Sequence, residues 1–565
     1  MELQPDTQRH RQAPLAAPAP GGQQGSDERG RVLAAWDATR YSYPVVPLLH
    51  TPFEQRAADI PDAVAVVSEG QTLTYAALNR RASCLAQRLR RAGVGPEIFV
   101  AVYLERSLEM VSALLAIFKA GGACVPLDVA TPPQRLAFFL RDCTPAVVLT
   151  HAQVRDRLPS EYGGRVMVLD ALPTDAGENS LPPPWQGHPL QAANLLYTSG
   201  STGQPKGVVN THAGLYNRLF WMQDRYRLQC GDRVLQKTPS SFDVALWEIL
   251  WPLHVGATLV LARPEGHKDS SYLTRLISEQ QVTVAHFVPS MLQIFLDEPG
   301  LTRCPTLRYL FRSGEVLSAH LQQRCFARLD AHLHNLYGPT EAAIDVTAWA
   351  CRRDSAARTV PIGSPIYNTQ ILLLDRRGAF VAQGAPGELC IGGMGLSRGY
   401  HRRPDLTAAC FLPHPGSPEP GARLYKTGDL AYEQPENTFE YKGRLDHQIK
   451  LRGQRIEPGE IEIALLRHPG VRSCLVQAQT FAANDQRLVA YLIAAGASRP
   501  ARKELLAFLR LSLPAYMHPS VFIYLEAWPL LSNGKIDRRA LPSATAARPG
   551  GTRGPAIAAA PSAGE

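Results

Sequence analysis

The chain has 565 residues, of which 45% are hydrophobic and 19% charged, and its formal net charge is +9. A single hydrophobic core stops growing at about 250–300 residues, so this length predicts at least two domains or subdomains. The composition is ordinary for a globular protein and excludes wholesale disorder. A nucleic-acid partner is not indicated, because the positive excess is small for so long a chain and no basic run carries interleaved aromatic residues.

Both ends of the chain differ in composition from the rest. Residues 1–30 are rich in Pro, Gly, Gln and Ala, and residues 543–565 have the same character, so both segments are predicted to be disordered tails. The sequence shows neither the apolar core of a secretory signal nor a run of about 18 apolar residues that could cross a membrane. The ten Cys form no C-x-x-C pair and no H-E-x-x-H pattern occurs. These features predict a cytoplasmic protein with reduced thiols, without a disulfide framework or a zinc site.

Between the tails, short apolar runs alternate with segments of helical periodicity. In chain order, strands are predicted at 98–103, 146–149, 258–261 and 283–287, and an amphipathic helical stretch follows the first of them through Phe118. This alternation predicts an α/β fold with largely parallel sheets. A polar, charged segment at 443–452 separates two apolar regions and predicts a domain boundary.

The segment 197–207, YTSGSTGQPKG, has the features of a phosphate-binding loop. Its glycines, Gly200 and Gly203 among them, allow close backbone approach, and its N–H groups can form an anion-binding nest. Lys206 adds a positive charge. Four hydroxyl groups add further donors, from Thr198, Ser199, Ser201 and Thr202. The loop does not match G-x-x-x-x-G-K-[ST], since a glycine directly follows the lysine and no glycine directly precedes it. A flexible Ser/Gly linker is the alternative, and the apolar NLLY directly before the loop argues against it.

With this loop, the chain resembles the adenylate-forming superfamily, and in particular the amino-acid-activating adenylation domains of nonribosomal peptide synthetases. Further segments match in the family's order, among them LTYAAL (73–78), KAGGACVPLD (119–128), FDVALWE (242–248), NLYGPTE (335–341), GELCIGGMGLSRGY (387–400), YKTGDL (425–430), GRLDHQIKLRGQRIEPGEIE (443–462), LPAYMHP (513–519) and NGKIDR (533–538). Residues 29–50 resemble the linker that follows a condensation domain. The resemblance implies a large N-terminal domain of stacked mixed and parallel sheets (51–446), a linker-like segment (31–50), and a small mobile α+β C-terminal lid (447–542).

The family reaction joins an amino acid to ATP, releases pyrophosphate, and passes the aminoacyl group to the phosphopantetheine thiol of a carrier protein. Negative charge develops where carboxylate and α-phosphate meet, so catalysis needs cations and fixed dipoles more than a general base. The resemblance implies that Lys535 bridges these two groups, that Glu341 is associated with Mg²⁺, and that Thr202 takes part in catalysis. Taken alone, Lys535 could be a solvated turn residue, because Asn-Gly is a common turn.

The same resemblance assigns nucleotide contacts and a hinge. Asp446 would be the hinge about which the small subdomain turns, moving Lys535 away and bringing the segment around Gly453 toward the path of the thiol. Tyr337 would lie against adenine and Asp429 would bind the ribose hydroxyls. Further nucleotide contacts would come from Asn335, Thr340, Tyr441 and Arg444.

Ten positions are assigned to the amino-acid pocket by resemblance. Asp243 would pair with the substrate ammonium and Lys535 with its carboxylate. The other eight would line the pocket: Val244, Trp247, His286, Phe311, Ser313, Leu336, Ile344 and Asp345. The bulky members narrow the pocket, while His286, Ser313 and Asp345 are polar, a pattern that resembles serine-activating domains. A site built to bind a hydroxyl rejects alanine, because its buried polar groups would be left unpaired.

Departures and absences limit this assignment. Ala245 replaces a usual Ser near the pocket wall, which weakens the preference for serine, and threonine or alanine remain alternatives. No H-H-x-x-x-D-G or G-G-x-S motif occurs, so a carrier protein acting in trans is expected, and the chain is either free-standing or part of a larger assembly. A small MbtH-type helper protein is a possible partner by family analogy.

Two other functions are less consistent with the sequence. An acid:thiol ligase that makes CoA thioesters is disfavoured by Asp243, and an inactive relative by the presence of Lys535, Glu341 and Asp429. The charge is also uneven. Segment 447–542 holds thirteen basic and seven acidic residues, so electrostatic steering of an acidic carrier by the lid is a hypothesis.

Overall fold

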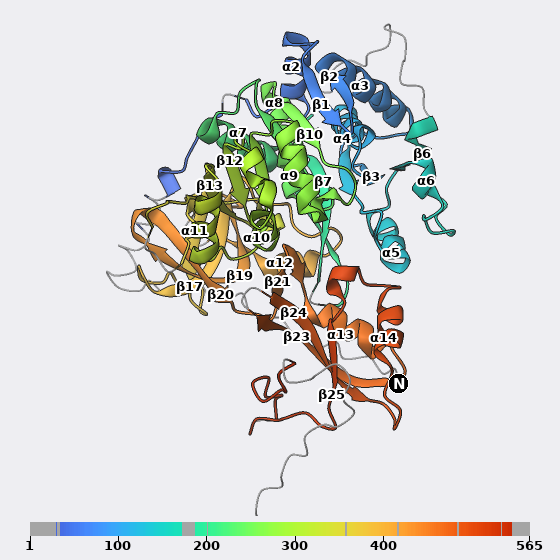
Figure 1. The fold of residues 1–565 in the computed structure, drawn as a ribbon, viewed down its shortest axis with the longest axis vertical. Helices are drawn as coiled ribbons and strands as arrows, with labels where there is room; N and C mark the ends of the chain where they lie inside the picture. Colours follow the sequence, from blue (N-terminus) through green and yellow to red (C-terminus); the bar gives the residue numbers. More distant parts are fainter. Residues whose placement is uncertain are drawn as a thin grey trace, which may run out of the picture.

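The computed structural model describes residues 30, 34, 36–43, 45–171, 187–200, 202–355, 359–414, 417, 419–482, 485–532 and 534–544. Nearly all of both predicted tails therefore lies outside the described residues. Figure 1 shows a large domain above a small C-terminal subdomain that contains β23, β24, β25, α13 and α14. No helix in the described part of the chain is long and apolar enough to cross a membrane.

Two sheets with mainly parallel strands form the centre of the large domain. The six-stranded sheet has the order β6-β5-β3-β4-β7-β8 and the nine-stranded sheet the order β15-β14-β13-β12-β11-β9-β10-β1-β2. Antiparallel pairs occur toward their edges, at β7–β8, β1–β2, β13–β14 and β14–β15. The bounds of the six-stranded sheet are β3 Phe99–Tyr103, β4 Ala123–Pro126, β5 Val147–Thr150, β6 Val166–Val168, β7 Ala192–Thr198 and β8 Lys206–Thr211. Those of the nine-stranded sheet are β1 Val64–Ser68, β2 Gln71–Thr74, β9 Arg233–Gln236, β10 Thr258–Leu261, β11 Val284–Phe287, β12 Tyr309–Arg312, β13 His332–Tyr337, β14 Thr347–Ala350 and β15 Ser364–Pro365.

Helices cover these sheets and contribute to several hydrophobic clusters. In the large domain they are α2 Thr51–Asp59, α3 Tyr75–Arg91, α4 Leu108–Ala120, α5 Pro133–Cys143, α6 Ala152–Arg155, α7 His212–Tyr226, α8 Val244–Val255, α9 Ser270–Glu279, α10 Pro289–Leu296, α11 Ala319–Arg328 and α12 Pro404–Cys410. Helix α4 differs from the prediction of an amphipathic stretch, because every residue in it except Glu109 is buried. A helix that is apolar all round is buried in the interior of a large domain.

A third sheet, entirely antiparallel, completes the large domain. Its order is β16-β17-β19-β18, with β20 paired to β19. Its strands are β16 Thr369–Leu374, β17 Pro386–Gly393, β18 Phe411–Pro413, β19 Arg423–Gln434 and β20 Thr438–Arg444. The alternation of strands and helices did not predict this sheet, since its segments lack intervening long helices. It carries Asp429 and Arg444 opposite each other in register.

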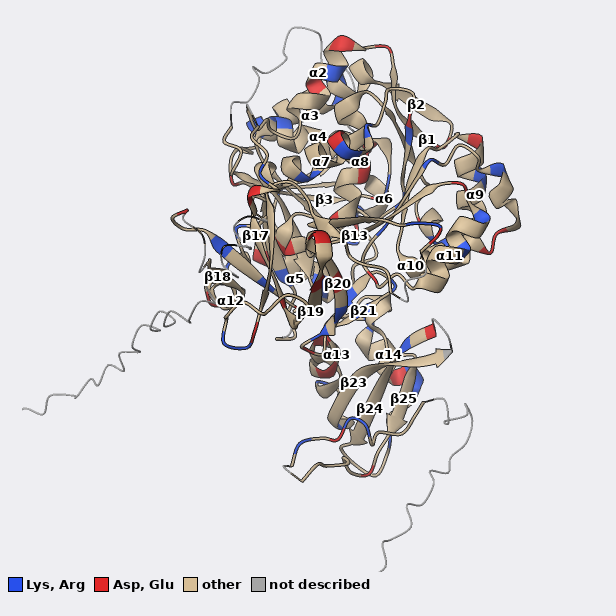
Figure 2. Ribbon diagram, turned by 90° about the vertical axis from the view of Figure 1, so that its left-hand side faces the viewer, with Lys and Arg blue, Asp and Glu red and all other residues tan. Residues whose placement is uncertain are grey.

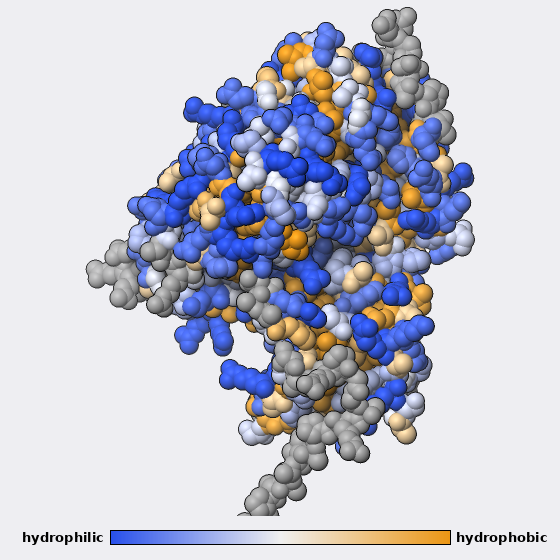
Figure 3. Space-filling view, viewed as in Figure 1, coloured by the Kyte–Doolittle hydropathy of each residue, from blue (hydrophilic) through white to orange (hydrophobic). Residues whose placement is uncertain are grey.

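The small subdomain has its own hydrophobic clusters, in which α13 and α14 pack on the sheet β23-β24-β25. Its elements are β21 Ile449–Leu451, β22 Gln454–Ile456, α13 Pro458–Leu466, β23 Val471–Ala482, β24 Asp485–Ala494, α14 Arg502–Leu509 and β25 Val521–Tyr524. The hairpin β21–β22 projects toward the large domain. Figure 2 shows basic and acidic segments meeting around β20 and β21, where the two parts join. Hydrophilic side chains dominate the face of the large domain seen in Figure 3.

Candidate active site

The phosphate loop connects the end of β7 to the start of β8. A side chain at Gly200 would place its Cβ 2.0 Å from the backbone oxygen of Gln204, so the tight turn requires glycine there. Gly203 has a φ of +79° and lies against Ile463 of the small subdomain. Ser199 donates its hydroxyl to the backbone oxygen of Arg455 at 2.6 Å. Thr198 closes β7, Thr202 is exposed at the tip, and Ser201 lies outside the described residues.

Glu341 is a buried carboxylate that collects three donors. Lys206 and the Tyr400 hydroxyl lie 3.2 and 2.8 Å from Oε1, and Arg455 donates to Oε2 at 2.8 Å. Burial alone would raise the pKa of Glu341, but Arg455 and Lys206 outweigh it and hold this pKa below its usual range. Glu341 is therefore ionised at neutral pH. Sequence reasoning assigned Lys206 and Glu341 but missed Tyr400 and Arg455, although both lie in matching motifs.

Asp429 is a second buried carboxylate with three donors. Tyr337 donates to Oδ2 at 2.6 Å, Lys450 lies 3.2 Å from the same oxygen, and Arg444 donates to Oδ1 at 2.6 Å. Lys450 also lies over the rings of Tyr337 and Tyr441, at 5.2 and 5.4 Å from their centroids. Burial, followed by the nearby Asp429, raises the pKa of the Tyr337 phenol.

Asp446 and Asn335 have their own partners. Arg444 donates from Nε and Nη2 to the two carboxylate oxygens of Asp446, each at 2.6 Å. Arg444 ends β20 and is nearly buried, whereas Asp446 lies between β20 and β21 and is half-exposed. The amide of Asn335 donates to the backbone oxygen of Pro361 at 2.6 Å, so its donor is used within the large domain.

The amino-acid pocket residues gather at the carboxyl ends of β11, β12 and β13, beside the start of α8. Parallel strands present their carboxyl ends at one edge, which is where open α/β sheets bind ligands. His286 and Phe311 pair in register on adjacent strands, and Trp247 of α8 packs against both rings at 6.0 and 5.6 Å between centroids. Leu336 lies on β13, Ile344 precedes β14, and Val244 is the first residue of α8.

Asp243 stands at the N-terminus of α8. It accepts from the backbone N–H of Val244 at 2.8 Å and from the Thr340 hydroxyl at 2.8 Å. Burial raises the pKa of Asp243 to about 7, and the nearby Asp345 carboxylate adds to this rise. The hydrogen bond from Thr340 acts in the opposite direction. Thr340 thus holds Asp243 in place, beside the turn that carries Glu341.

The polar part of the pocket consists of His286, Ser313 and Asp345. His286 Nε2 lies 2.9 Å from Ser313 Oγ, and burial lowers the pKa of His286 well below its usual value, so the ring is neutral. Asp345 is paired with Arg218 of α7 at 2.7 Å, and both side chains are almost fully buried. Sequence reasoning missed Arg218, which no matching motif contains.

Lys535 lies on the small subdomain, away from the amino-acid pocket residues, in this arrangement. Its backbone oxygen accepts from Leu531 at 2.8 Å, and the next residue, Ile536, packs with the cluster on the sheet β23-β24-β25. Lys535 is exposed. The hairpin β21–β22 instead approaches the pocket, where the Gly453 N–H donates to Glu315 Oε1 at 2.7 Å. Two sequence-assigned groups, Lys535 and Asp243, are therefore on different subdomains and are not brought together by these contacts.

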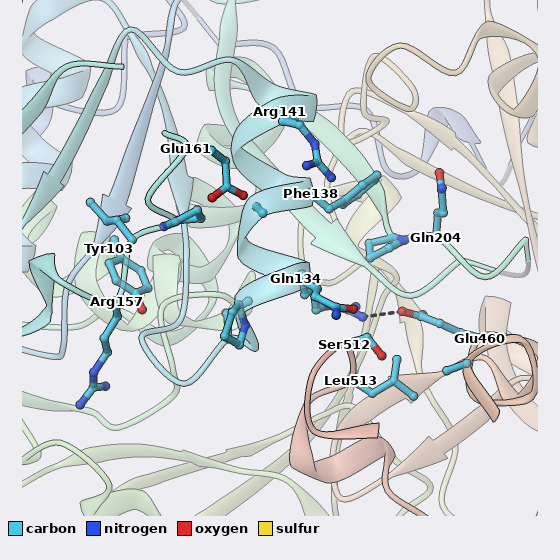
Figure 4. Close-up of a pocket in the computed structure, with 18 of the residues that line it drawn as sticks. Tyr103, Gln134, Phe138, Arg141, Arg157, Glu161, Gln204, Glu460, Ser512 and Leu513 are labelled. Atoms are coloured by element: carbon cyan, nitrogen blue, oxygen red, sulfur yellow. Dashed lines mark hydrogen bonds and ion pairs between the residues drawn. The ribbon is translucent and has the colours of Figure 1, made fainter. Parts of the chain in front are cut away.

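A cavity of about 970 Å³ lies between the phosphate loop, α5 and the small subdomain. Figure 4 shows Gln134, Phe138 and Arg141 from the α5 side facing Glu460, Ser512 and Leu513 of the small subdomain. An ion pair between Arg135 and Glu460 bridges it. This cavity is separate from the amino-acid pocket residues, none of which lines it.

The acidic side chains determine whether the chain could hold a metal ion. No group of three or more His, Cys, Asp or Glu that could hold a metal ion occurs in the ranges that the structure describes. Glu341 is nevertheless an ionised oxygen ligand next to the phosphate loop, the type that suits Mg²⁺ shared with phosphates. In this arrangement Arg455 occupies its Oε2.

Comparisons with known proteins show the family of the chain. Residues 53–401 match the family described as AMP-binding enzyme, and residues 460–535 match the AMP-binding enzyme C-terminal domain. Phosphinothricin tripeptide synthetase PhsB of Streptomyces viridochromogenes is 47% identical over 92% of the chain, which spans 44% of that protein. Zwittermicin A synthase ZmaJ of Bacillus cereus is 41% identical over 86% of the chain and 93% of its own length. The chain spans only 8% of tyrocidine synthase 3 of Brevibacillus parabrevis, to which it is 42% identical.

Solved structures show the same architecture. An artificially fused adenylation–PCP di-domain, NpsA-ThdA from Klebsiella oxytoca, aligns with a TM-score of 0.76 at 25% identity, covering 85% of this chain and 94% of that one. The four-domain synthetase AB3403, solved with AMP and glycine, aligns at 0.65 and 31% identity over 90% of this chain and 37% of its own. The expected fold class is confirmed. The chain belongs to the AMP-binding enzyme family, and within it to the AMP-forming adenylation domains of nonribosomal peptide synthetases.

Proposed function

We propose that the chain activates L-serine with ATP to seryl-AMP and pyrophosphate, and then transfers the seryl group to the phosphopantetheine thiol of a carrier protein. The observation that carries the choice of serine is the contact between neutral His286 and Ser313 at 2.9 Å, with the buried Asp345 as the third polar residue assigned to the pocket. These groups offer hydrogen bonds to a small hydroxylated side chain. Trp247 and Phe311 limit the space around them.

The ends of the substrate would be held by opposite charges. Asp243, fixed by Thr340 and by the start of α8, would accept the substrate ammonium, and Lys535 would bind its carboxylate and the α-phosphate. Lys206 and the N–H groups of the phosphate loop supply positive potential for the phosphates. Glu341, with Thr340 beside it, would hold Mg²⁺ against the phosphates once Arg455 has withdrawn, and the metal ion would neutralise phosphate charge. Asp429 would bind the ribose, with Tyr337 against adenine.

The two half-reactions would use two positions of the small subdomain, with Asp446 as the hinge. The contacts of Gly453 with Glu315 and of Arg455 with Glu341 support an arrangement suited to thiol transfer, because Lys535 is outside the pocket. Adenylation would require the small subdomain to turn and bring Lys535 in. Asp446 is exposed and accepts from Arg444 and from the backbone N–H of Gln448, contacts close in sequence that are consistent with a hinge.

The proposed partner is an acidic peptidyl carrier protein in trans. Arg141, Arg157 and Arg467 are exposed around the cavity between the subdomains. Such a basic rim would favour the approach of an acidic protein. An MbtH-type helper protein is a further proposed partner, supported by family analogy alone.

The proposal is tested by ATP–pyrophosphate exchange across a panel of amino acids. L-Serine is expected to give the highest kcat/KM, followed by threonine or alanine as the closest alternatives. A preference for a large apolar amino acid would refute the serine assignment. Formation of CoA thioesters from carboxylic acids without an amino group would instead favour an acid:thiol ligase.

A further inference from the structure

We infer that Arg218 is a specificity-determining residue of the amino-acid pocket, acting through Asp345, which it fixes as an ionised acceptor for the substrate side chain. This inference rests on the proposed amino-acid site and names a residue outside its ten assigned positions. Arg218 lies in α7 and is separated from Asp345 by 127 residues of sequence.

The contact between the two side chains is asymmetric. Arg218 donates from Nε and Nη2 to the same oxygen, Oδ2 of Asp345, at 3.2 and 2.7 Å. The other oxygen, Oδ1, accepts no hydrogen bond from the residues that the structure describes. Nη1 of Arg218 is fully buried and has no hydrogen-bond partner, which is not the case for Oδ1 of Asp345. One carboxylate oxygen is therefore anchored while the other remains available.

The pair lies among the pocket residues. Asp345 is one of the charges that raise the pKa of Asp243, and Arg218 is one of those that lower the pKa of His286. Both electrostatic effects require proximity. The turn that leads to Asp345 also carries Thr340, which donates to Asp243 at 2.8 Å, so this turn joins Asp345 to the proposed ammonium site.

The backbone around Asp345 explains why an anchor is needed. Ala343 and Ile344 have φ values of +55° and +83°, which are unfavourable for residues with side chains. A Cβ at Gly338 would lie 2.5 Å from the Cα of Asp345, so glycine lets the two strands of this turn approach. Arg218 ties the end of this strained turn to α7. The turn also carries Thr340 and Glu341.

The chemical consequence concerns selectivity. An Asp buried without a cation would become protonated, and it could then donate as well as accept. Burial raises the pKa of Asp345, and the ion pair with Arg218 at 2.7 Å acts against this rise. In the charged pair, Asp345 only accepts hydrogen bonds, and the pair adds no net charge to the pocket. The Arg218–Asp345 pair therefore suits a substrate with a neutral side chain that donates one hydrogen bond. It disfavours alanine, which would leave Oδ1 of Asp345 unpaired.

The test compares Arg218→Met, Arg218→Lys and Asp345→Asn with the control Arg225→Met, an exposed arginine on the same helix. Exchange kinetics are measured with serine, threonine, alanine and glycine, together with melting temperatures. For Arg218→Met, the serine-to-alanine ratio of kcat/KM is expected to fall about tenfold or more, mainly through the KM for serine. The ratio for Arg218→Lys should lie between those of wild type and Arg218→Met, since lysine keeps the charge but lacks the two parallel N–H donors of the guanidinium.

A readout independent of turnover is calorimetric binding of the sulfamoyl-adenosine analogues of seryl-AMP and alanyl-AMP. Asp345→Asn should lose the preference for the seryl analogue. The double variant Arg218→Met/Asp345→Asn should lose little more of this preference, because the two residues act as a unit. Equal losses for serine and alanine, accompanied by a lower melting temperature, would show that the pair only supports the turn and would overturn the inference. If Arg218→Met does not fold, Asp345→Asn and Arg218→Lys decide the question.

The test of Arg218 can fail independently of the proposal that the substrate is serine. If wild type prefers another amino acid, serine is wrong, and Arg218 is then judged by whether Arg218→Met and Asp345→Asn change the ranking of the panel in the same way. An unchanged ranking overturns the inference whichever amino acid wild type prefers.

Discussion

The guanidinium of Arg455 donates to Oε2 of Glu341 at 2.8 Å, so a side chain of the small subdomain pairs with a buried carboxylate of the large domain. A similar pair joins Lys450 to Asp429 at 3.2 Å. Both carboxylates are those proposed to serve the metal ion and the ribose. The position of the small subdomain and the binding of ligands are therefore connected through the same oxygen atoms.

Glu341→Gln is expected to reduce pyrophosphate exchange by about 100-fold, because the amide loses the charge that opposes Lys206 and binds a metal ion. It should also lower the free energy of unfolding by up to about 3 kcal/mol, since buried cations lose their partner. Exchange assays and chemical denaturation measure the two effects. The control is Glu97→Gln at an exposed ion pair with Arg398, which should change stability by less than about 1 kcal/mol. Wild-type exchange in Glu341→Gln would contradict its assignment.

Lys535→Ala should abolish most exchange activity and leave the melting temperature unchanged. Lys535 is exposed in the arrangement described, so its ammonium group contributes little to folding stability, whereas adenylation would need it in the pocket. Lys503→Ala, another exposed lysine of the small subdomain, is the matched control and should keep full exchange. Equal activity of the two variants would remove Lys535 from the proposed mechanism.

Much of the fold could be predicted from sequence where local patterns decide it. The strand predicted at 258–261 coincides with β10, and the strands predicted near 98, 146 and 283 begin one residue later. The burial of α4 on all sides was not predicted, because it depends on what packs around the helix and not on its own periodicity. The antiparallel third sheet was missed for another reason, because its strands are not separated by long helices and so do not show the alternation.

In the site, matching motifs supplied residue types but not their partners. The sequence could assign Asp345 to the pocket, yet it could not show that Arg218 occupies one of its oxygens, because the partner is on a distant helix. Similarly, Arg455 lies in a matching motif, but only the packing of the hairpin β21–β22 shows which carboxylate it meets. Long-range ion pairs leave no local signal in a single sequence.

The kcat/KM for the amino acid is expected to fall below pH 7. Burial raises the pKa of Asp243 to about 7, so below that pH the carboxyl is neutral and no longer attracts the substrate ammonium. The KM for ATP should change less over the same range. Exchange rates at subsaturating amino acid between pH 6 and 8 measure this, and a flat profile would contradict it.

The same pKa predicts the effect of Asp243→Asn on stability. A folded pKa above the unfolded value means that the native state binds its proton more tightly, so stability falls as pH rises from about 4 through 7. Removing the charge should therefore raise or preserve the melting temperature at pH 8 while exchange is lost. Asp330→Asn, at a fully exposed carboxylate that pairs with Arg353, is the control and should alter neither property. A large loss of stability in Asp243→Asn would show that the carboxylate acts mainly as the cap of α8.

Carrier aminoacylation should weaken with ionic strength more than pyrophosphate exchange does. Thirteen of the basic residues lie in segment 447–542 against seven acidic ones, and Arg467 of this segment is exposed at the cavity between the subdomains. Exposed charges more than about 10 Å apart are screened at 0.1 M salt, so steering of an acidic carrier is salt-sensitive, whereas chemistry among buried groups is not. Arg467→Glu should therefore raise the KM for the carrier protein at low salt, leave exchange unchanged, and approach wild type at high salt.

The control is Arg487→Glu, at an exposed arginine that pairs with Asp485 on β24. It separates a local docking effect from an effect of net charge. Equal effects of the two variants would assign the steering to the overall charge of the lid, and insensitivity of both to salt would exclude it.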